Sequence, residues 1–313
     1  MEFSKLKNKK LLITGGNGLL GKTFQSKNID YKIYAPSSKE CNLFIKDDIK
    51  NYIRNTNPDF VVHCACKVGG IQANILNQFE FGHSNMLMYL NLLSSLKELN
   101  ISCKILNIGS SCMYPRNSVQ PLKIEYLGIG ELEPTNESYG FAKLFGTKLC
   151  QHLSDDKSNN LELKTLIAPN LYGPFDKFNE DAHLIPAVIK KIDNKKNEDL
   201  ALLPAQPTEI RREFMFSEDF ADAMWFSINN WEKIPSILNV GIGCDFSIKE
   251  YYDIIANVLG VKVEYSDYDH SMPKGMKQKL LDSSDAFKIG IYPKTSLKEG
   301  IEKTYKYYLE NIK

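Results

Sequence analysis

Short apolar runs alternate with longer helix-type patterns from residue 11 to about residue 168. Five of these runs have the composition of buried β-strands: KLLITGG, YKIYAP, DFVVHCA, CKILNIGSS and LKTLIAP. Strands separated by helix-length segments indicate βαβ crossovers, because parallel strands need a long connection. The sequence therefore predicts an α/β fold with a doubly wound parallel sheet that helices cover on both faces.

Helix signals mark the other half of the pattern. Apolar residues three or four positions apart predict one buried helix face, made by Met86, Leu90, Leu93 and Leu96. Capping boxes at Ser247–Glu250 and Ser296–Glu299 predict two later helices, and Gly260 predicts the end of the first. Beyond Tyr172 the strand and helix alternation loosens, which predicts a smaller α/β C-terminal lobe.

The composition narrows the class of protein. The 313 residues carry a net charge of +1, so the chain has no bulk attraction to nucleic acid or to a membrane surface. No apolar run has membrane-spanning length, and the basic N-terminal residues precede only the short run Leu11–Thr14, so no signal peptide is expected. The seven cysteines show no C-x-x-C pair. We expect a soluble cytoplasmic protein with reduced thiols and no metal site.

A glycine-rich turn follows the first predicted strand directly. GGNGLLG places three glycines in a G-x-x-G-x-x-G arrangement between a strand and a helix. Small residues there let the backbone approach a pyrophosphate at the helix N-terminus, as in Rossmann-type dinucleotide-binding folds. The predicted cofactor contacts in this turn are Gly15, Asn17, Gly18, Leu19, Leu20 and Gly21.

The end of the second strand distinguishes NADP(H) from NAD(H). NAD-binding proteins usually place a carboxylate there, which would repel a 2′-phosphate. This chain has Ala35-Pro-Ser-Ser-Lys39, with hydroxyl groups and a cation. The sequence therefore predicts NADP(H), with Ser38 and Lys39 as the phosphate contacts.

Three further residues have the chemistry of a carbonyl reductase. Tyr139 and Lys143 stand four residues apart in Y-x-x-x-K, so on a helix they share one face. An ammonium beside a phenol favours the phenolate and brings proton exchange closer to neutral pH. Ser110, at the carboxyl end of its strand, is placed to donate a hydrogen bond to the same carbonyl oxygen.

Together, the glycine turn, the strand-end serine and Y-x-x-x-K resemble the extended short-chain dehydrogenase/reductases. More narrowly, the chain resembles the GDP-L-fucose synthases along nearly its whole length. The matching blocks, in the family's order, are VVHCACKVGGIQAN, GSSCMYP, SYGFAK, NLYGP, HLIPAVIKK, RREFMFSEDFADA and KLLD. Such an ordered set is more specific than any one motif.

The resemblance implies an activity and a set of residues. It implies NADPH-dependent reduction at C4 of a GDP-linked 4-keto-sugar, with prior inversion at C3 and C5 by Cys112 and His183, and a homodimer. If the segment after Ser110 is extended, Cys112 points to the same side as Ser110. The resemblance also implies cofactor contacts from Ala65, Lys143, Pro169, Asn170, Leu171 and His183, and substrate contacts from Ser111, Asn170, Lys191, Arg212 and Lys279.

The same resemblance predicts the division of the chain. Residues 1–170, with a returning segment at about 213–243, form the predicted NADP-binding domain. Residues 171–212 and 244–313 form the predicted substrate lobe.

Some positions depart from the family pattern. Ala205-Gln-Pro-Thr-Glu-Ile210 replaces a block that usually contains tryptophan, Gln278 replaces a usual arginine, and Asn17 stands where arginine is common. The sugar therefore stays open between a 6-deoxy-hexose and a related heptose. Three alternatives also stay open: a C4 reductase without epimerase activity, another nucleotide-sugar epimerase of this family, and a non-catalytic NADP-binding regulatory protein.

Overall fold

The computed structural model describes residues 9–27, 31–179, 182–267 and 275–313. Its central sheet has six strands in the order β10-β5-β4-β3-β1-β2, and every neighbouring pair is parallel. Five of them are the predicted strands. The bounds are β1 (Lys10–Thr14), β2 (Lys32–Tyr34), β3 (Phe60–His63), β4 (Cys103–Ser110), β5 (Leu161–Ala168) and β10 (Ile237–Asn239).

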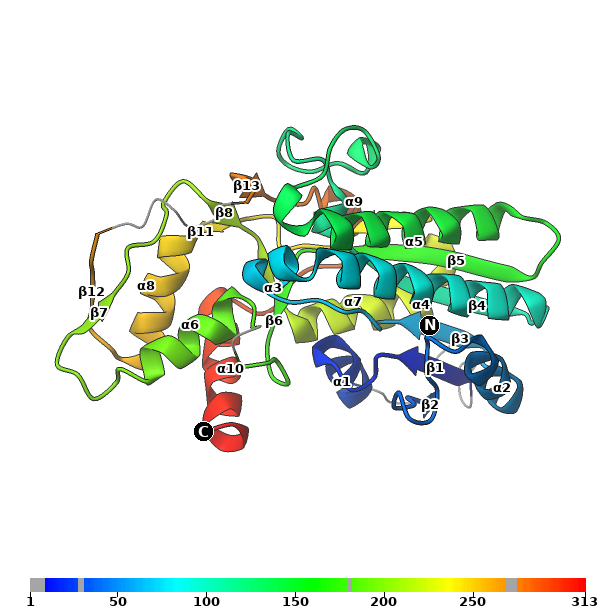
Figure 1. Cartoon of the computed structure of the whole chain (residues 1–313), viewed down its shortest axis with the longest axis horizontal. Helices are drawn as coiled ribbons and strands as arrows, with labels where there is room; N and C mark the ends of the chain where they lie inside the picture. Colours follow the sequence, from blue (N-terminus) through cyan, green and yellow to red (C-terminus); the bar gives the residue numbers. More distant parts are fainter. Residues whose placement is uncertain (1–8, 28–30, 180–181, 268–274) are drawn as a thin grey trace.

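Helices cover both faces of this sheet (Figure 1). Leu11 and Ile13 of β1 pack on the face that carries α1 (Leu19–Ser26) and α7 (Ser217–Asn229). Leu12, between them, packs on the opposite face with α2 (Lys46–Thr56), α4 (Gln78–Glu98) and α5 (Glu137–Asp155). Successive strand residues point to opposite faces, so a continuous apolar run buries both. The doubly wound Rossmann-type prediction is confirmed.

The predicted helix around residue 90 is present, and its predicted apolar face is confirmed only in part. Leu93 and Leu96 are buried as predicted, whereas Met86 is half-buried and Leu90 is 47% exposed. Tyr89 and Leu92 join Leu93 and Leu96 in the core that faces the sheet. The buried face is therefore turned away from Leu90, which stays on the outer surface.

A second apolar core lies beside the sheet (Figure 1). It joins α6 (Leu184–Asp193), α8 (Ile248–Leu259) and α10 (Leu297–Asn311), with β7 (Ala201–Leu203) paired to β12 (Val263–Tyr265). Ser247 and Glu250 form the predicted capping box of α8, and Gly260 ends it with φ +70°. Ser296 caps α10 by accepting a hydrogen bond from the Glu299 N–H.

Short strands connect the two cores at the carboxyl edge of the sheet. β6 (Asn170–Tyr172) pairs with β9 (Phe214–Phe216), and β8 (Arg211–Arg212) lies between β11 (Phe246–Ser247) and β13 (Gln278–Lys279). The remaining elements are α3 (Ile71–Leu76), α9 (Ser284–Lys288) and the 3-10 helices η2 (Ser111–Met113), η3 (Ile124–Tyr126), η4 (Pro134–Asn136) and η5 (Trp231–Lys233).

Two general features bear on function. Within the described ranges, no helix has the length and apolar character needed to cross a membrane. All seven cysteines are free.

Candidate active site

The glycine turn between β1 and α1 is as tight as predicted. Gly15 has φ +71°, and a Cβ there would lie 2.6 Å from the Ala65 backbone nitrogen. A Cβ on Gly21 would lie 2.3 Å from the Gly15 carbonyl oxygen. The Gly18 N–H donates to that same oxygen at 3.1 Å. The turn thus brings the start of α1 close to the end of β3, and leaves its first N–H groups available to an anion.

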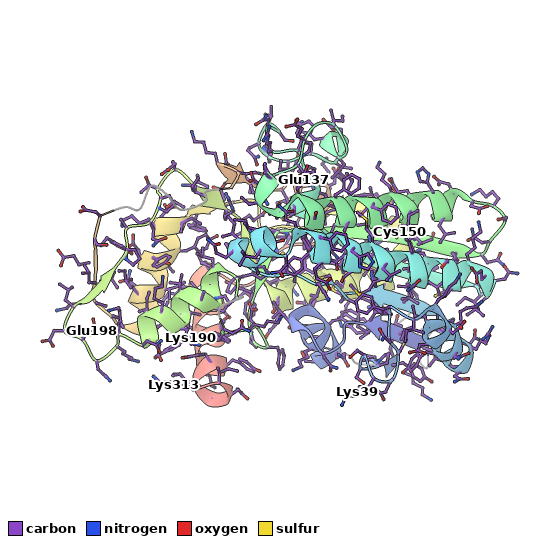
Figure 2. The ribbon with its side chains drawn as sticks, viewed as in Figure 1. Lys39, Glu137, Cys150, Lys190, Glu198 and Lys313 are labelled. Carbon is purple, nitrogen blue, oxygen red and sulfur yellow. The ribbon has the colours of Figure 1, made fainter. Side chains whose placement is uncertain are left out.

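Other predicted cofactor residues surround this turn. Leu19 and Leu20 begin α1, and Asn17 is exposed. Ser38 and Lys39 lie exposed in the turn that follows β2, and Figure 2 shows Lys39 at the edge of the molecule. The neighbouring Glu40 carboxylate accepts hydrogen bonds at 2.8 Å from both the Ser37 N–H and its hydroxyl. The Glu40 carboxylate is therefore hydrogen-bonded within its own turn, and the exposed Lys39 ammonium is the cation next to it.

Ser110, Tyr139 and Lys143 come together at the end of β4. Ser110 is the last residue of that strand, and both Tyr139 and Lys143 are buried on α5. The Lys143 ammonium, only 2% exposed, donates to the Ile108 carbonyl at 2.8 Å and to the Tyr89 hydroxyl at 3.4 Å. The structure thus places all three residues at the carboxyl edge of the sheet.

Tyr139 and Lys143 shift each other's pKa. Burial raises the pKa of the Tyr139 phenol, while the Lys143 ammonium and a hydrogen bond with Ser110 lower it. Burial lowers the pKa of Lys143, but the hydroxyl groups of Tyr89 and Tyr139 and the Cys66 thiol outweigh it, so the pKa is raised. The net effect is a raised pKa for Tyr139, so Lys143 is held as a cation beside a phenol that keeps its proton.

Cys112 follows this group, but not in the extended conformation that we expected. Ser111 to Met113 form the 3-10 helix η2, and the Ser110 hydroxyl caps it by accepting from the Cys112 N–H at 3.2 Å. The extended-segment prediction is wrong, because a serine at a strand end offers the next turn a hydrogen-bond acceptor. The Cys112 sulfur instead lies 3.4 Å from both Asn136 Nδ2 and Lys279 Nζ.

His183 lies farther along the chain, at the start of α6. It is the residue before the first turn of that helix and is half-buried. Burial lowers the pKa of its imidazole, with a smaller contribution from Lys177. Across the described ranges, the structure records no hydrogen bond from His183 to Cys112 or Tyr139. Residues 180–181, which precede it closely, lie outside the described part of the chain.

The predicted substrate residues fall into two groups. Arg212 and Lys279 are register partners in the β8–β13 pair, and Asn170 lies nearby, where its side chain donates to the Glu213 carbonyl at 3.1 Å. Ser111 is buried in η2. Lys191 stands apart, exposed on α6 with its ammonium 5.8 Å from the centre of the Tyr252 ring. Pro169 and Leu171 flank Asn170 at the β5–β6 junction.

The chain is similar to known proteins along most of its length. The model of the NAD dependent epimerase/dehydratase family matches residues 11–241. The chain belongs to this family. Its curated relatives include GDP-L-colitose synthase of Yersinia pseudotuberculosis, 44% identical and covering 96% of this chain and 98% of the relative. Another is GDP-L-fucose synthase of Azorhizobium caulinodans, 40% identical and covering 97% of each.

Solved structures with the same fold include two Campylobacter jejuni enzymes. A GDP-6-OMe-4-keto-L-xylo-heptose reductase is 25% identical, with a TM-score of 0.86, over 96% of this chain and 98% of that one. A GDP-mannoheptose C4 reductase with NADP bound is 26% identical, with a TM-score of 0.81, over the same shares. The extended short-chain dehydrogenase/reductase resemblance is confirmed at the level of family and fold.

Sequence reasoning missed three residues of this epimerase/dehydratase site. Glu213 is 1% exposed, and its carboxylate accepts from the N–H groups of Ile242, Gly243 and Leu281 at 2.6 to 3.0 Å. Asn136 contacts Cys112, and Tyr89 contacts Lys143. Glu213 had a signal, because it lies in the matched block RREFMFSEDFADA. The other two contacts join remote segments, which the spacing of residues does not reveal.

Gln278 has a defined place in this epimerase/dehydratase. Its side chain donates to Asp245 Oδ2 at 2.7 Å, and Arg211 Nε donates to Asp245 Oδ1 at 2.7 Å. Asp245 therefore links β8 and β13 through their side chains. The amide at position 278 satisfies this acid without adding a second cation beside Arg211.

Proposed function

We propose that this epimerase/dehydratase reduces C4 of a GDP-linked 4-keto-sugar with NADPH, after inverting C3 and C5 of the same sugar. The observation that carries the proposal is the meeting of Ser110, Tyr139 and Lys143 with the Cys112 thiol at one edge of the sheet. The similarity to GDP-L-colitose synthase, GDP-L-fucose synthase and a GDP-heptose reductase supports the GDP-sugar class, and we propose a 6-deoxy-hexose or a related heptose as the sugar.

The residues present fit NADP(H). A Cβ at Gly15 or Gly21 would clash with neighbouring backbone, so these glycines allow the tight turn that a pyrophosphate site at the start of α1 requires. Ser38 and Lys39 lie exposed where we expect a 2′-phosphate to bind, and the Glu40 carboxylate accepts hydrogen bonds from Ser37. When bound, NADPH supplies the hydride that C4 receives.

For the reduction, the chain supplies the proton and the polarisation. Ser110 donates a hydrogen bond to the C4 carbonyl oxygen, and Tyr139 delivers its phenolic proton to that oxygen. Lys143, fixed by the Ile108 carbonyl, stabilises the phenolate that remains. We propose Asn170, Pro169, Leu171 and Ala65 as contacts around the nicotinamide side, and Arg212 and Lys191 as contacts of the diphosphate.

For the inversion, a 4-keto group acidifies the protons on C3 and C5. One of Cys112 and His183 removes such a proton and leaves an enolate, and the other returns a proton to the opposite face. A thiol and an imidazole can each carry a proton in general acid–base catalysis. The contacts that hold Cys112 favour this assignment over a reductase without epimerase activity.

The test is a panel of GDP-linked 4-keto hexoses and heptoses, with a UDP-linked 4-keto-hexose as the matched control. NADPH should be consumed only with GDP-linked keto-sugars, and Tyr139→Phe should abolish consumption while NADPH binding is kept. A protein that binds NADPH but oxidises it with none of these sugars would be a regulatory protein, and the reductase proposal would be wrong. Deuterium incorporation at C3 and C5 in deuterated water without NADPH tests the epimerase step.

Three features of organisation belong to the same proposal. The NADP-binding domain comprises residues 1–170 and about 213–243, and the substrate lobe comprises 171–212 and 244–313. Leu90 and Phe141, 47% and 54% exposed on α4 and α5, support a homodimer through these helices. A monomeric mass in solution would contradict the dimer. The free thiols support a reducing, cytoplasmic location.

A further inference from the structure

Two side chains from distant parts of the chain meet at the Cys112 sulfur. Lys279 lies on β13 and Asn136 at the start of α5, and each places a nitrogen 3.4 Å from the sulfur. Neither an ammonium nor an amide nitrogen accepts a hydrogen bond, so both can only donate. The sulfur is therefore the acceptor in both contacts, and two donors fix its position.

Lys279 is held firmly in place. It is only 6% exposed, and the backbone around it is hydrogen-bonded on both sides. The Leu281 N–H donates to Glu213 at 3.0 Å, the Leu280 N–H donates to the Gln120 side chain at 3.0 Å, and the Leu280 carbonyl accepts from Leu122 at 2.7 Å. The ammonium therefore reaches the sulfur from a fixed strand.

Burial makes this contact significant. A buried cation is costly unless a polar or anionic group compensates it. In the part of the chain that the structure describes, the Cys112 sulfur is the partner recorded for the Lys279 ammonium. Asn136 adds a second donor, and its Oδ1 is buried without a recorded partner in the same ranges. Both donors are therefore directed at the sulfur.

We propose that Lys279 and Asn136 are positioning residues for Cys112, and that the Lys279 charge acts on this thiol rather than on the substrate diphosphate. The proposal rests on the function given above, in which Cys112 exchanges protons at C3 and C5. It differs from the family expectation, which assigns Lys279 to the nucleotide. The two assignments predict different effects of one substitution.

The first experiment measures thiol reactivity without any sugar. The NADP-bound protein is treated with iodoacetamide over a range of pH, and alkylation of each cysteine is followed by peptide mass mapping. Lys279→Met should slow alkylation of Cys112 about tenfold, because a charge-assisted contact that fixes the sulfur is lost. Asn136→Ala should slow it about threefold, because only a neutral donor is lost. Lys279→Arg, which keeps the charge, should restore most of the rate.

The exposed Cys244 is the internal control of the same experiment. Its alkylation rate should stay the same in every variant, which separates a local effect from partial unfolding. Unchanged alkylation of Cys112 in both Lys279→Met and Asn136→Ala would overturn the proposal.

The second experiment measures deuterium incorporation at C3 and C5 without NADPH. Lys279→Met should lower kcat about tenfold with KM within about twofold, the pattern of a residue that acts through the catalytic group. Lys191→Met, which alters a proposed diphosphate contact, should raise KM instead. A raised KM with normal kcat and normal alkylation in Lys279→Met would assign Lys279 to the diphosphate and overturn the proposal.

The two experiments also separate this proposal from the proposed function. If the unaltered protein neither exchanges deuterium nor consumes NADPH, the proposed function fails. The alkylation rates would then still report on the contact between Lys279 and Cys112.

Discussion

Replacing Tyr89 with Phe removes a single oxygen atom from the centre of the site. The hydroxyl donates to Asn107 Oδ1 at 2.8 Å and accepts from the Lys143 ammonium at 3.4 Å. The ring itself is fixed, since it packs edge-on against His63 and against α5 where a Cβ on Gly146 would lie 2.4 Å from it. The substitution therefore tests the hydroxyl without disturbing the packing.

The structure sets the size of the effect. Asn107 is fully buried, and its Oδ1 loses the donor that the structure records for it, which costs about 1–3 kcal/mol. The long contact to the ammonium adds about 1 kcal/mol. Lys143 keeps its bond to the Ile108 carbonyl but loses its second anchor. Turnover should fall about five- to tenfold, because ~1–1.4 kcal/mol of positioning is lost in the transition state.

Tyr114 provides a matched control. It is fully buried, and its hydroxyl donates to the buried Asn239 Oδ1 at 2.7 Å, so Tyr114→Phe loses the same kind of bond. The structure records no contact between the Tyr114 hydroxyl and Lys143. Tyr114→Phe should therefore lose about 1–3 kcal/mol of stability and keep normal turnover.

Two measurements decide the outcome. Urea denaturation gives the free energy of unfolding of both variants, and NADPH oxidation over a range of pH gives their turnover. The profile of turnover against pH should also shift to higher pH in Tyr89→Phe. If the Lys143 ammonium is displaced, it lowers the pKa of Tyr139 by a smaller amount. Equal losses of stability and equally normal turnover in the two variants would show that the Tyr89 hydroxyl does not position Lys143.

Three further positions, Gly21, Lys39 and Glu213, test other parts of the site. Gly21→Ala should lower the free energy of unfolding by about 1–3 kcal/mol and weaken NADP binding, because its Cβ would lie 2.3 Å from the Gly15 carbonyl oxygen. Gly18→Ala is the control: its Cβ would lie 3.5 Å from the same oxygen, so the free energy of unfolding should stay nearly unchanged. Lys39→Ala should raise the Kd for NADP about tenfold and leave the Kd for NAD unaltered. Binding titrations measure the two constants, and an equal change in both would reject a contact between Lys39 and the 2′-phosphate. Burial raises the pKa of Glu213 to about 7 from 4.5, although three backbone N–H groups lower it. Because the folded state binds this proton more tightly, stability should fall as pH rises from about 4.5 to about 7, and Glu213→Gln should flatten that part of the pH profile.

The sequence predicted what depends on local order along the chain. The strand–turn–helix at Gly15 to Gly21 and the Tyr139–Lys143 pair are set by residues within a few positions of one another, and both are present. The segment after Ser110 was predicted wrongly for a local reason as well. The serine hydroxyl captures the Cys112 N–H and turns the chain, which alternation of side chains along a strand does not take into account.

What the sequence did not predict depends on tertiary pairing. Tyr89 touches Lys143 across two helices, and Lys279 touches Cys112 across 167 positions of the chain. The family resemblance implied that Lys279 contacts the substrate nucleotide, and no nearby sequence pattern relates it to Cys112. The pairing of β13 with β8 brings Lys279 to this edge of the sheet, where its ammonium lies 3.4 Å from the Cys112 sulfur.

The residues that we propose for reduction and those that we propose for inversion depend on different parts of the fold. Ser110, Tyr139 and Lys143 are held by β4 and α5, and the two contacts that fix Lys143 come from β4 and α4. Cys112 has a further contact from β13, a strand that Glu213 and Leu122 join to the rest of the molecule. A change in β13 can therefore alter proton exchange at C3 and C5 while the reducing group stays intact.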